Sequence, residues 1–258
     1  MATELVKADY NDLGALEAAL KREKPVAAIV QLARQKIDDS YSHEEVITLI
    51  KRVSPGTVVI TDDNYAVMKV ERIGAQCGAD LSAFSLFKLL GPEGVGCVVG
   101  KRRYVEVIEK QNYSGGTQVQ GHQAMAALRG LIQAPVALAI QSGVVEELAE
   151  RLSKGEVRGV KGAFIANAQS KVLIVELERN NAEAVIAEAE KLGAAPWPVG
   201  SESYHEFVPM FYRVSGTFRA SDPSLELRMI RVNPMRSGPE TVMRILAEAM
   251  AAVAKEGK

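Results

Sequence analysis

Short apolar runs alternate with capped helical segments through the first hundred residues, and this alternation most constrains the fold. The apolar run PVAAIVQL (residues 25–32) and the β-branched run Thr57–Thr61 are expected strands. Between them, Ser42–Glu45 has the pattern of a helix capping box. Strands that are apolar throughout are buried on both faces, as in a parallel sheet covered by helices. We therefore predict an α/β fold with a mainly parallel sheet and flanking helices.

The neighbouring segments continue this pattern. Asp12 is a suitable N-cap for a helix over Leu13–Lys24. Further elements are expected from apolar periodicity and from breaker residues. They are a helix near Val67–Gly74, a strand near Asp80–Ser85, a strand at CVVG (residues 97–100), and long helices over Gln120–Leu152 that are interrupted at Pro135.

After about residue 150 the pattern changes to mixed strands and helices. KVLIVEL (Lys171–Leu177) is an expected strand and NNAEAVIAEAEKLGA an expected helix. Two strand-like segments, FVPMFYRVS and ELRMIRVN, precede a final amphipathic helix that begins near GPETV. We predict two domains, a large α/β domain over residues 1–150 and a smaller C-terminal α+β domain over residues 151–258.

Composition excludes several classes of function. A formal net charge of −1 gives no reason to expect a nucleic-acid partner or an anionic membrane surface. Two cysteines are too few for a disulfide framework or a structural zinc site, and the histidines lack metal-ligand spacing. No apolar stretch is judged long enough to cross a bilayer, which takes about 20 residues. We expect a cytoplasmic protein without a bound metal.

Lys88 is the first candidate for chemistry. It lies between Phe87 and Leu89, at the end of an expected strand and just before the glycine-rich turn GPEGVG. Desolvation in such a context lowers the pKa of a lysine and makes its amine a nucleophile toward an aldehyde. The alternative is a lysine whose stem lies on apolar surface with its head in water.

Two further groups strengthen this hypothesis. Ser85, three residues before Lys88, places a hydroxyl where it can donate to a phosphate. Asp62 stands where an expected parallel strand ends, which is where open α/β sheets bind ligands. Its carboxylate could keep a pyridine nitrogen protonated, and Tyr65 could donate to the oxygen on such a ring. Asp62 or Asp63 could instead be a loop-start or N-cap residue, an interpretation that suits Asp63 better.

Asp-x-x-Tyr at a strand end, followed by Ser-x-x-Lys and a glycine-rich turn, resembles the fold type I enzymes that depend on pyridoxal phosphate. The resemblance implies that Asp62 contacts the pyridine nitrogen, Tyr65 the ring oxygen and Ser85 the phosphate. It makes Lys88 the Schiff-base lysine. DDNYAVMKVE and FKLLGPEGVGCVVG look similar to an aminotransferase-like group akin to the class V and selenocysteine-synthase-like enzymes.

Three more residues follow from the resemblance. NYSGGTQ (residues 112–118) is similar to a loop that offers a hydroxyl to the phosphate of a neighbouring subunit, a place that Thr117 would fill. The segment RVN resembles the strand whose arginine clamps a substrate carboxylate. Arg231 is the candidate and Arg228 its competitor, since the planar guanidinium binds a carboxylate in a bidentate way.

The resemblance implies an enzyme that holds pyridoxal 5'-phosphate, acts on a small-molecule amino-acid substrate and forms a homodimer. We favour an aminotransferase, with a lyase or a selenium- or sulfur-transfer enzyme as the alternative. A cofactor-less dimerisation or binding module is the alternative of a different class. It is favoured by one departure from the family, because Lys88 stands early and no phosphate-binding glycine-rich turn precedes Asp62, as if an N-terminal segment were absent.

Overall fold

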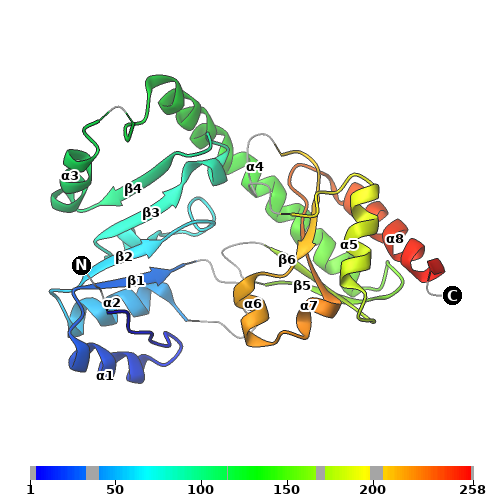
Figure 1. The fold of residues 1–258 in the computed structure, drawn as a ribbon, viewed down its shortest axis with the longest axis horizontal. Coiled ribbons are helices and arrows are strands. Elements are labelled where there is room, and N and C mark those ends of the chain that lie inside the picture. Colours follow the sequence, from blue (N-terminus) through cyan, green and yellow to red (C-terminus); the bar gives the residue numbers. More distant parts are fainter. Residues whose placement is uncertain (1–3, 33–40, 115, 167–171, 198–205, 257–258) are drawn as a thin grey trace. The chain divides into compact units, whose positions relative to one another are not determined.

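The computed structural model describes residues 4–32, 41–114, 116–166, 172–197 and 206–256, and it forms two compact units (Figure 1). The first contains the described residues up to Leu32, from Tyr41 to Phe84 and from Gly96 to Val119. The second contains Ser85–Val95 and the described residues from Gln120 onward. The sequence places the boundary near residue 150, and that division stays a prediction.

The sheet that runs through the first unit has the strand order β1-β2-β3-β4. β1, β2 and β3 are parallel, as predicted, with Gln31 opposite Asp62 and Asp62 opposite Ala83. The hydrogen bonds from Leu86 N–H to Val95 O and from Lys101 N–H to Asp80 O make β4 antiparallel to β3. The elements are α1 (Leu13–Glu23), β1 (Ala27–Gln31), α2 (His43–Val53), β2 (Val58–Asp62), η1 (Gly74–Cys77), β3 (Leu81–Ser85), β4 (Gly96–Gly100) and α3 (Arg102–Gln111).

Local capping starts the first two helices where the sequence predicts them. The Asp12 side chain accepts a hydrogen bond from Ala15 N, and the Ser42 hydroxyl accepts one from Glu45 N. Each bond satisfies a backbone donor that the first helical turn leaves without a partner. α1 and α2 then pack their apolar faces against β1 and β2, in a core that includes Leu20, Val30, Ile47, Ile50 and Val59.

The predicted helix over Val67–Gly74 is wrong. The structure has turns there, and only the short 3-10 helix η1 follows. Tyr65 and Met68 both have positive φ, which is incompatible with a continuous right-handed helix. The backbone instead returns to Asp63 O, which accepts from both Ala66 N and Val67 N. The segment is therefore a compact loop at the carboxyl end of β2.

The second unit is an antiparallel sheet with the strand order β5-β6-β8-β7 and helices against it. Buried residues of α4, α5 and α8 form its main core with the sheet, including Leu148, Val175, Val185, Val232 and Leu246. This arrangement confirms the predicted small α+β part. Its elements are η2 (Leu86–Leu89), α4 (Gly121–Ser153), β5 (Val160–Ile165), β6 (Leu173–Leu177), α5 (Ala182–Lys191), β7 (Met210–Arg213), α6 (Gly216–Ser221), α7 (Leu225–Arg228), β8 (Met229–Asn233) and α8 (Pro239–Glu256).

Two predictions of local structure are wrong in this unit. The strand expected at ELRMIRVN begins instead with a helical turn, α7, before β8 starts at Met229. Pro135 does not interrupt α4, which runs through it for 33 residues. Pro135 lies on the exposed side of α4, while Ala134 and Leu138 are buried on the other side. Tertiary packing on both sides of the proline keeps the helix continuous, although proline removes one backbone donor.

The prediction that no apolar stretch is long enough to cross a bilayer is wrong for α4. Among the described residues, α4 alone is long and apolar enough by those two criteria. It buries one side against β5, η2 and α8 in this structure, with Gly130, Val145 and Leu148 among its buried residues. A helix with one side committed to a protein core passes the same test as a membrane span.

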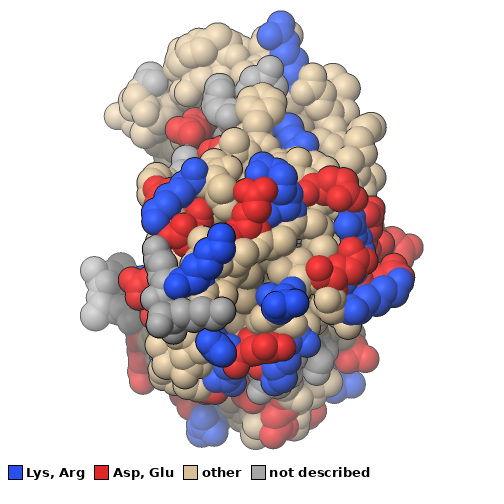
Figure 2. Space-filling model, turned by 90° about the vertical axis from the view of Figure 1, so that its right-hand side faces the viewer, with Lys and Arg blue, Asp and Glu red and all other residues tan. Residues whose placement is uncertain are grey.

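Basic and acidic side chains are mixed on the molecular face that Figure 2 shows. Ion pairs among the described residues follow the same pattern, for example Lys154–Glu150, Lys161–Glu176 and Arg244–Glu248. Exposed pairs of this kind contribute little to stability, typically 0–1 kcal/mol each. On this face the charges of opposite sign neutralise one another locally.

Candidate active site

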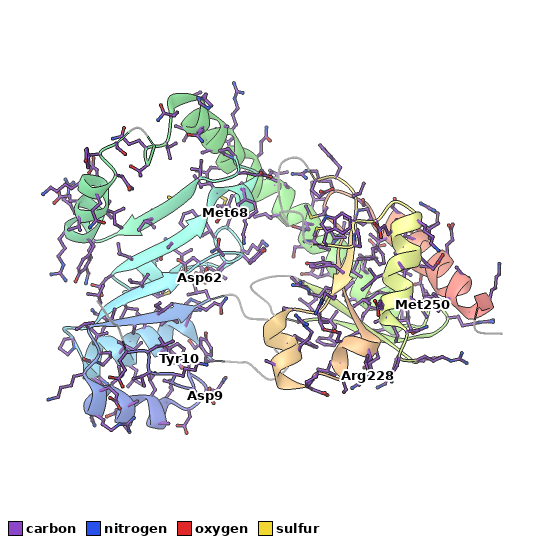
Figure 3. All side chains as sticks on the ribbon, viewed as in Figure 1. Asp9, Tyr10, Asp62, Met68, Arg228 and Met250 are labelled. Carbon is purple, nitrogen blue, oxygen red and sulfur yellow. The ribbon has the colours of Figure 1, made fainter. Side chains whose placement is uncertain are left out.

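Asp62 is the last residue of β2, as predicted, and its side chain is half-buried (Figure 3). Its Oδ1 accepts two hydrogen bonds from Asn64, one from the backbone N–H at 3.0 Å and one from Nδ2 at 2.9 Å. This is a local turn in which an aspartate side chain stabilises the backbone two residues on. Asp62 thus has a structural task that requires no ligand.

Asp63, the next residue, is completely buried. Its backbone N–H donates to Ala83 O at 3.0 Å, which holds it beside β3. Its Oδ2 accepts a hydrogen bond from Gly74 N at 3.3 Å, whereas Oδ1, also buried, receives none from the described residues. A buried carboxylate oxygen without a partner is costly, and such exceptions call for an explanation.

Polar groups surround this carboxylate. Burial raises the pKa of Asp63, against the opposing effects of the Ser82 and Thr61 hydroxyls and of the Gly74 N–H. The two hydroxyls lie 2.9 Å from each other, and the Ser82 hydroxyl also accepts from Ala75 N at 2.7 Å. A cationic group placed against Oδ1 would stabilise the charged form of Asp63.

Gly74 is required for this arrangement. A Cβ at position 74 would lie 2.0 Å from Thr61 Oγ1, so no larger residue fits without displacing the Thr61 side chain. The close approach of the backbone brings Gly74 N–H to Asp63. The loop after β2 is therefore built around this one carboxylate.

Tyr65 lies in the same loop, half-buried and with φ of 65°. The left-handed region costs a non-glycine residue roughly 1–2 kcal/mol, and residues held there cluster at functional sites. Lys69 Nζ lies 5.6 Å from the centroid of the Tyr65 ring. The loop thus holds Tyr65 in a strained backbone conformation.

Lys88 lies in η2, immediately after β3, and its side chain is half-buried. Its Nζ is 5.1 Å from the centroid of the Phe87 ring. Ser85, also half-buried, is the N-cap residue of η2. The structure therefore places both predicted residues in one turn, three positions apart, at the end of a buried strand.

The turn after Lys88 is held by close backbone packing. Leu90 ends η2 with φ of 60°, and Gly91 N–H donates to Leu86 O at 2.9 Å. Gly130 of α4 packs onto this turn, because a Cβ there would lie 2.6 Å from Leu90 C and 2.7 Å from Gly91 N. The absence of a side chain at position 130 lets α4 support the segment that carries the lysine.

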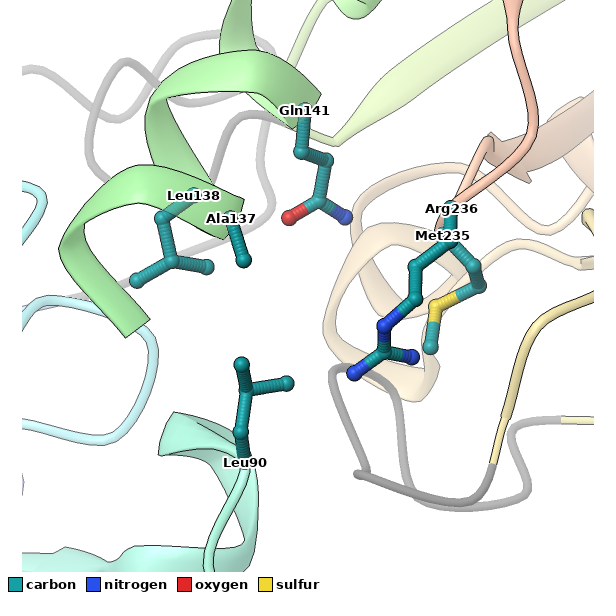
Figure 4. A pocket seen from close by; sticks show the side chains of 6 residues that line it. All are labelled: Leu90, Ala137, Leu138, Gln141, Met235 and Arg236. Atoms are coloured by element: carbon teal, nitrogen blue, oxygen red, sulfur yellow. The ribbon is translucent and has the colours of Figure 1, made fainter. Parts of the chain in front are cut away.

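A shallow hollow borders this turn within the second unit, with about 250 Å³ of empty space that is partly open to solvent (Figure 4). Leu90 and Met235, two of its lining residues, both have left-handed backbone conformation. Gln141 and Arg236 supply its polar groups. The full lining is Leu90, Ala137, Leu138, Gln141, Met235 and Arg236.

The two candidate arginines for a carboxylate differ in their surroundings. Arg228 Nε lies 3.5 Å from Glu176 Oε1, and its Nη1 donates to Ser224 Oγ at 3.2 Å. Arg231 donates from Nε to Arg213 O at 3.0 Å, and its guanidinium stacks 4.1 Å from the centroid of the Tyr212 ring. The ring contact and the hydrogen bond to Arg213 O restrict the position of the Arg231 guanidinium.

Thr117 is exposed in a turn of the first unit. Its hydroxyl donates to Ser114 O at 3.0 Å, and its backbone N–H donates to the same oxygen. Gly116 is described and Gly115 lies outside the described residues, so only part of the predicted loop can be placed. The role of Thr117 toward a neighbouring subunit stays a prediction.

The sequence predicts Asp62 as the carboxylate that faces a ligand and Asp63 as a loop-start or N-cap residue, and the role of Asp62 toward a ligand stays a prediction. Both are acidic residues at a strand end, and only the direction of the side chain distinguishes them. The alternation of side chains along the strand is the sequence feature that separates the two residues, because successive residues of a strand point to opposite faces. The sequence predicts that Asp62 faces a ligand, and in the structure Asp63 carries the buried oxygen that has no hydrogen-bond partner among the described residues. In the described part of the chain, no three histidine, cysteine or acidic side chains are grouped as metal ligands.

Two family models match adjacent parts of the chain. The model for class-V aminotransferases matches residues 11–143, and the model for the YhfS-like C-terminal domain matches residues 146–246. The first match covers β2, β3 and η2, with Asp62, Asp63 and Lys88.

Relatives and solved structures agree with these matches. The chain is 52% identical over 253 residues to the uncharacterized protein YhfS of Escherichia coli, which covers 98% of this chain and 70% of the relative. The structure of YhfS from Escherichia coli, described as pyridoxal-5'-phosphate dependent, matches with a TM-score of 0.91 at 53% identity over 96% of this chain and 68% of that one. A cystathione gamma lyase from Micromonospora echinospora matches with a TM-score of 0.74 at 16% identity, over 95% of this chain and 68% of that one. The chain belongs to the aminotransferase class-V family and has the fold of the type I pyridoxal-phosphate-dependent enzymes.

Proposed function

We propose that this protein is a pyridoxal-phosphate-dependent enzyme that acts on an amino acid, with Lys88 as the residue that binds the cofactor covalently. The observation that carries the proposal is Asp63, a fully buried carboxylate with one oxygen that receives no hydrogen bond from the described residues. A protonated pyridine nitrogen is the kind of group that such an oxygen accepts. The family match and the pyridoxal-phosphate dependence of the similar YhfS structure support the choice of cofactor.

The residues present fit this cofactor. Asp63 would hold the ring nitrogen, a role that we assign to it in preference to Asp62, whose Oδ1 is occupied by Asn64. Ser85 would contact the phosphate and Tyr65 the ring oxygen, as the family resemblance implies. The bound cofactor supplies an electron-withdrawing ring that stabilises negative charge at the α-carbon of an amino acid.

Lys88 has two tasks in this proposal. Its amine would hold the cofactor covalently, and the free amine would accept the proton from the substrate α-carbon. Gly130 and Gly91 limit the movement of the turn that carries Lys88, because the backbones there are in close contact. Such fixed placement is what a general base needs, since proton transfer requires hydrogen-bond distance.

Arg231 is the proposed partner of the substrate α-carboxylate. Its guanidinium lies over the Tyr212 ring, with Cζ 4.1 Å from the ring centroid, and its Nε donates to Arg213 O. Arg228 is less suitable, because it already faces the carboxylate of Glu176.

Replacement of each arginine by lysine tests which of the two binds the substrate carboxylate. Arg231→Lys should raise the KM for an amino acid by at least about tenfold, since lysine lacks the fork, whereas Arg228→Lys should leave it within about twofold.

We assign the reaction to transamination, in which the amino group passes from an amino acid to a 2-oxo acid. Loss of a β-substituent, the lyase reaction, begins with the same proton removal and differs only in the following step. The two are separated by the product. Amine transfer consumes a 2-oxo acid in equal amount and releases no ammonia, whereas elimination releases ammonia without a 2-oxo acid acceptor. The assay should test a panel of amino acids with 2-oxoglutarate and with pyruvate.

The decisive first experiment is the absorbance spectrum of the purified chain after incubation with pyridoxal phosphate and removal of the excess. We expect the visible band of a lysine-bound cofactor, lost on borohydride reduction, with the label on Lys88 in a peptide map. Lys88→Ala should lack the band. A chain without any band would instead support the cofactor-less binding module.

Paired asparagine variants test the assignment of the ring-nitrogen carboxylate. Asp63→Asn should lower the rate of α-proton exchange by at least about 100-fold and shift the visible band, since the ring nitrogen is no longer held protonated. Asp62→Asn should retain the band and most of the exchange rate. The reverse result would return the role to Asp62.

A further inference from the structure

The hollow beside Leu90 combines an apolar lining with two polar side chains (Figure 4). Gln141 is 8% exposed, so its amide is buried at the wall of the hollow. Arg236 is the only charged side chain among the six described lining residues, and none of the six is acidic. Sites for small molecules have this composition, mostly apolar with a few polar groups that fix the ligand.

The orientation of the Gln141 amide follows from its partner. Asn233 Oδ1 accepts from Met235 N–H at 3.0 Å, so the Gln141 atom that lies 2.6 Å from the same oxygen must be the donor Nε2. Figure 4 shows the amide oxygen on the other side, directed toward Ala137. Among the described residues, the Gln141 side chain has no other hydrogen bond. The hollow therefore offers an acceptor, Gln141 Oε1, on an apolar wall.

Arg236 brings a positive charge to the opposite side of the hollow. Its Nη1 donates to Glu206 O, and its Cζ lies 5.1 Å from the centroid of the Phe207 ring. Figure 4 shows Arg236 and Leu138 facing each other across the hollow. A positive charge among apolar groups favours an anion, and the planar guanidinium matches a carboxylate.

Two residues of the lining have an unfavourable backbone conformation. Leu90 has φ of 60° and Met235 has φ of 51°, both in the left-handed region. Residues with a Cβ avoid this region, and those held there cluster at ligand-binding sites. Local hydrogen bonds maintain both turns, one from Gly91 N–H to Leu86 O and one from Met235 N–H to Asn233 Oδ1. The strain at two separate turns of one hollow indicates a site for a ligand.

We propose that the hollow binds a small hydroxy acid, with its carboxylate at Arg236 and its hydroxyl donating to Gln141 Oε1. A short apolar chain between these two groups lies against Leu90 and Leu138. A hydroxyl suits this place better than an ammonium group, because the charge of Arg236 repels a second cation in a space of about 250 Å³. The proposal rests on neither the cofactor nor the amino-acid reaction.

Calorimetric titration of the full chain tests the proposal with three matched probes. We expect 3-hydroxybutyrate to bind saturably with a dissociation constant of about 1 mM or less. Butyrate lacks the hydroxyl and should bind at least about threefold more weakly, and butane-1,3-diol lacks the carboxylate and should bind at least about tenfold more weakly. Absence of saturable binding would mean that water alone fills the hollow and would overturn the proposal, as would equal affinity for the three probes.

Variants of the lining test where the probe binds. Ala137→Leu fills the hollow beside the Gln141 oxygen and should weaken binding of 3-hydroxybutyrate at least about tenfold, as should Arg236→Gln, which removes the charge. Ala139→Leu, at an exposed position of α4 outside the lining, is the matched control and should change the affinity less than about twofold. Circular dichroism checks that each variant is folded.

The carboxylate of the probe could instead bind at Arg231, the proposed partner of the amino-acid substrate. Arg231→Lys and Lys88→Ala should both leave the affinity for 3-hydroxybutyrate within about twofold of wild type. Binding that is lost in Arg231→Lys and retained in Ala137→Leu would overturn the proposal and assign the probe to the substrate site. A chain that binds 3-hydroxybutyrate but shows no visible cofactor band would contradict the proposed function alone.

Discussion

Gln141 donates a 2.6 Å hydrogen bond from Nε2 to Asn233 Oδ1, which joins the middle of α4 to the end of β8. Both side chains are buried, and the same Asn233 oxygen accepts Met235 N–H at 3.0 Å. One side-chain oxygen therefore fixes both the helix and the left-handed turn at Met235 that lines the hollow beside Leu90.

Removal of this bond should destabilise the second unit. Gln141→Leu deletes the donor and leaves Asn233 Oδ1 with one partner instead of two, which should lower the free energy of unfolding by about 1–2 kcal/mol. Urea denaturation measures the change. Gln133→Ala, at an exposed position of the same helix, is the control and should stay within about 0.5 kcal/mol of wild type. An unchanged midpoint in Gln141→Leu would show that the bond contributes nothing.

Two glycines of α4 should respond in opposite directions to alanine. Gly130→Ala places a Cβ 2.6–2.7 Å from backbone atoms of Leu89, Leu90 and Gly91, so it should cost about 1–3 kcal/mol and weaken the visible band of the Lys88-bound cofactor. Gly143→Ala meets nothing within 4 Å and should stabilise the helix by about 0.5–1 kcal/mol. Thermal unfolding and the absorbance spectrum measure both. Equal effects at the two positions would contradict the close packing at Gly130.

Asp80 should make stability depend on acid pH. Its burial alone would raise the pKa, but hydrogen bonds from Lys101, Lys51 and Val59 N–H outweigh that effect and lower the pKa to about 2 from the ordinary 3.8. Because the folded-state pKa is the lower one, the stabilisation is complete above about pH 4 and is lost as the pH falls toward 2. Both lysines are partly exposed, which reduces the contribution to about 1–2 kcal/mol.

Asp80→Asn should therefore be less stable than wild type at pH 7, and the difference should shrink toward zero near pH 2. Lys101→Met, which removes one of the two lysines, should show a smaller loss with the same pH dependence. The measurement is the free energy of unfolding in urea between pH 2 and pH 7. A difference that stays constant with pH would mean that the Asp80 charge is not responsible.

Asp63 should show the opposite dependence, because its pKa is raised by burial. A raised folded-state pKa means that the folded chain binds the proton more tightly, so stability falls as the pH rises through the folded-state pKa. Asp63→Asn removes this charge and should not lower the melting temperature of the cofactor-free chain at pH 7. A strong loss of stability in that variant would identify Asp63 as a structural residue.

Much of the fold follows from local sequence pattern. Asp12 and Ser42 start α1 and α2 where capping predicts them, because a side-chain oxygen beside a helix start acts locally. The apolar runs at β1 and β2 give the predicted parallel pair, but the expected burial on both faces does not hold for β1, where Val30 is buried and Ile29 is 65% exposed. Lys88 lies at the end of such a strand, so its place in a tight turn was predictable from the glycines after it.

The structural features that the sequence pattern does not predict depend on contacts between distant residues. The loop after β2 has helical spacing in sequence, but its backbone turns back to Asp63 O and bends around Gly74. Pro135 is a helix breaker in isolation, and α4 continues through it because buried residues on both sides hold the helix. The choice between Asp62 and Asp63 likewise depends on the partners that each side chain meets, Asn64 in one case and Gly74 in the other.

The contacts of Asp80 have a consequence for how the first unit opens. Its single carboxylate accepts hydrogen bonds from Lys51 on α2 and from the amide of Val59 in β2, and it forms an ion pair with Lys101, which follows β4. Separation of any one of these segments leaves a buried charge with fewer partners. In hydrogen exchange, amides of α2, β2 and β4 should therefore become labelled together in one cooperative opening, and local fraying at the edge of the sheet should not extend past Asp80.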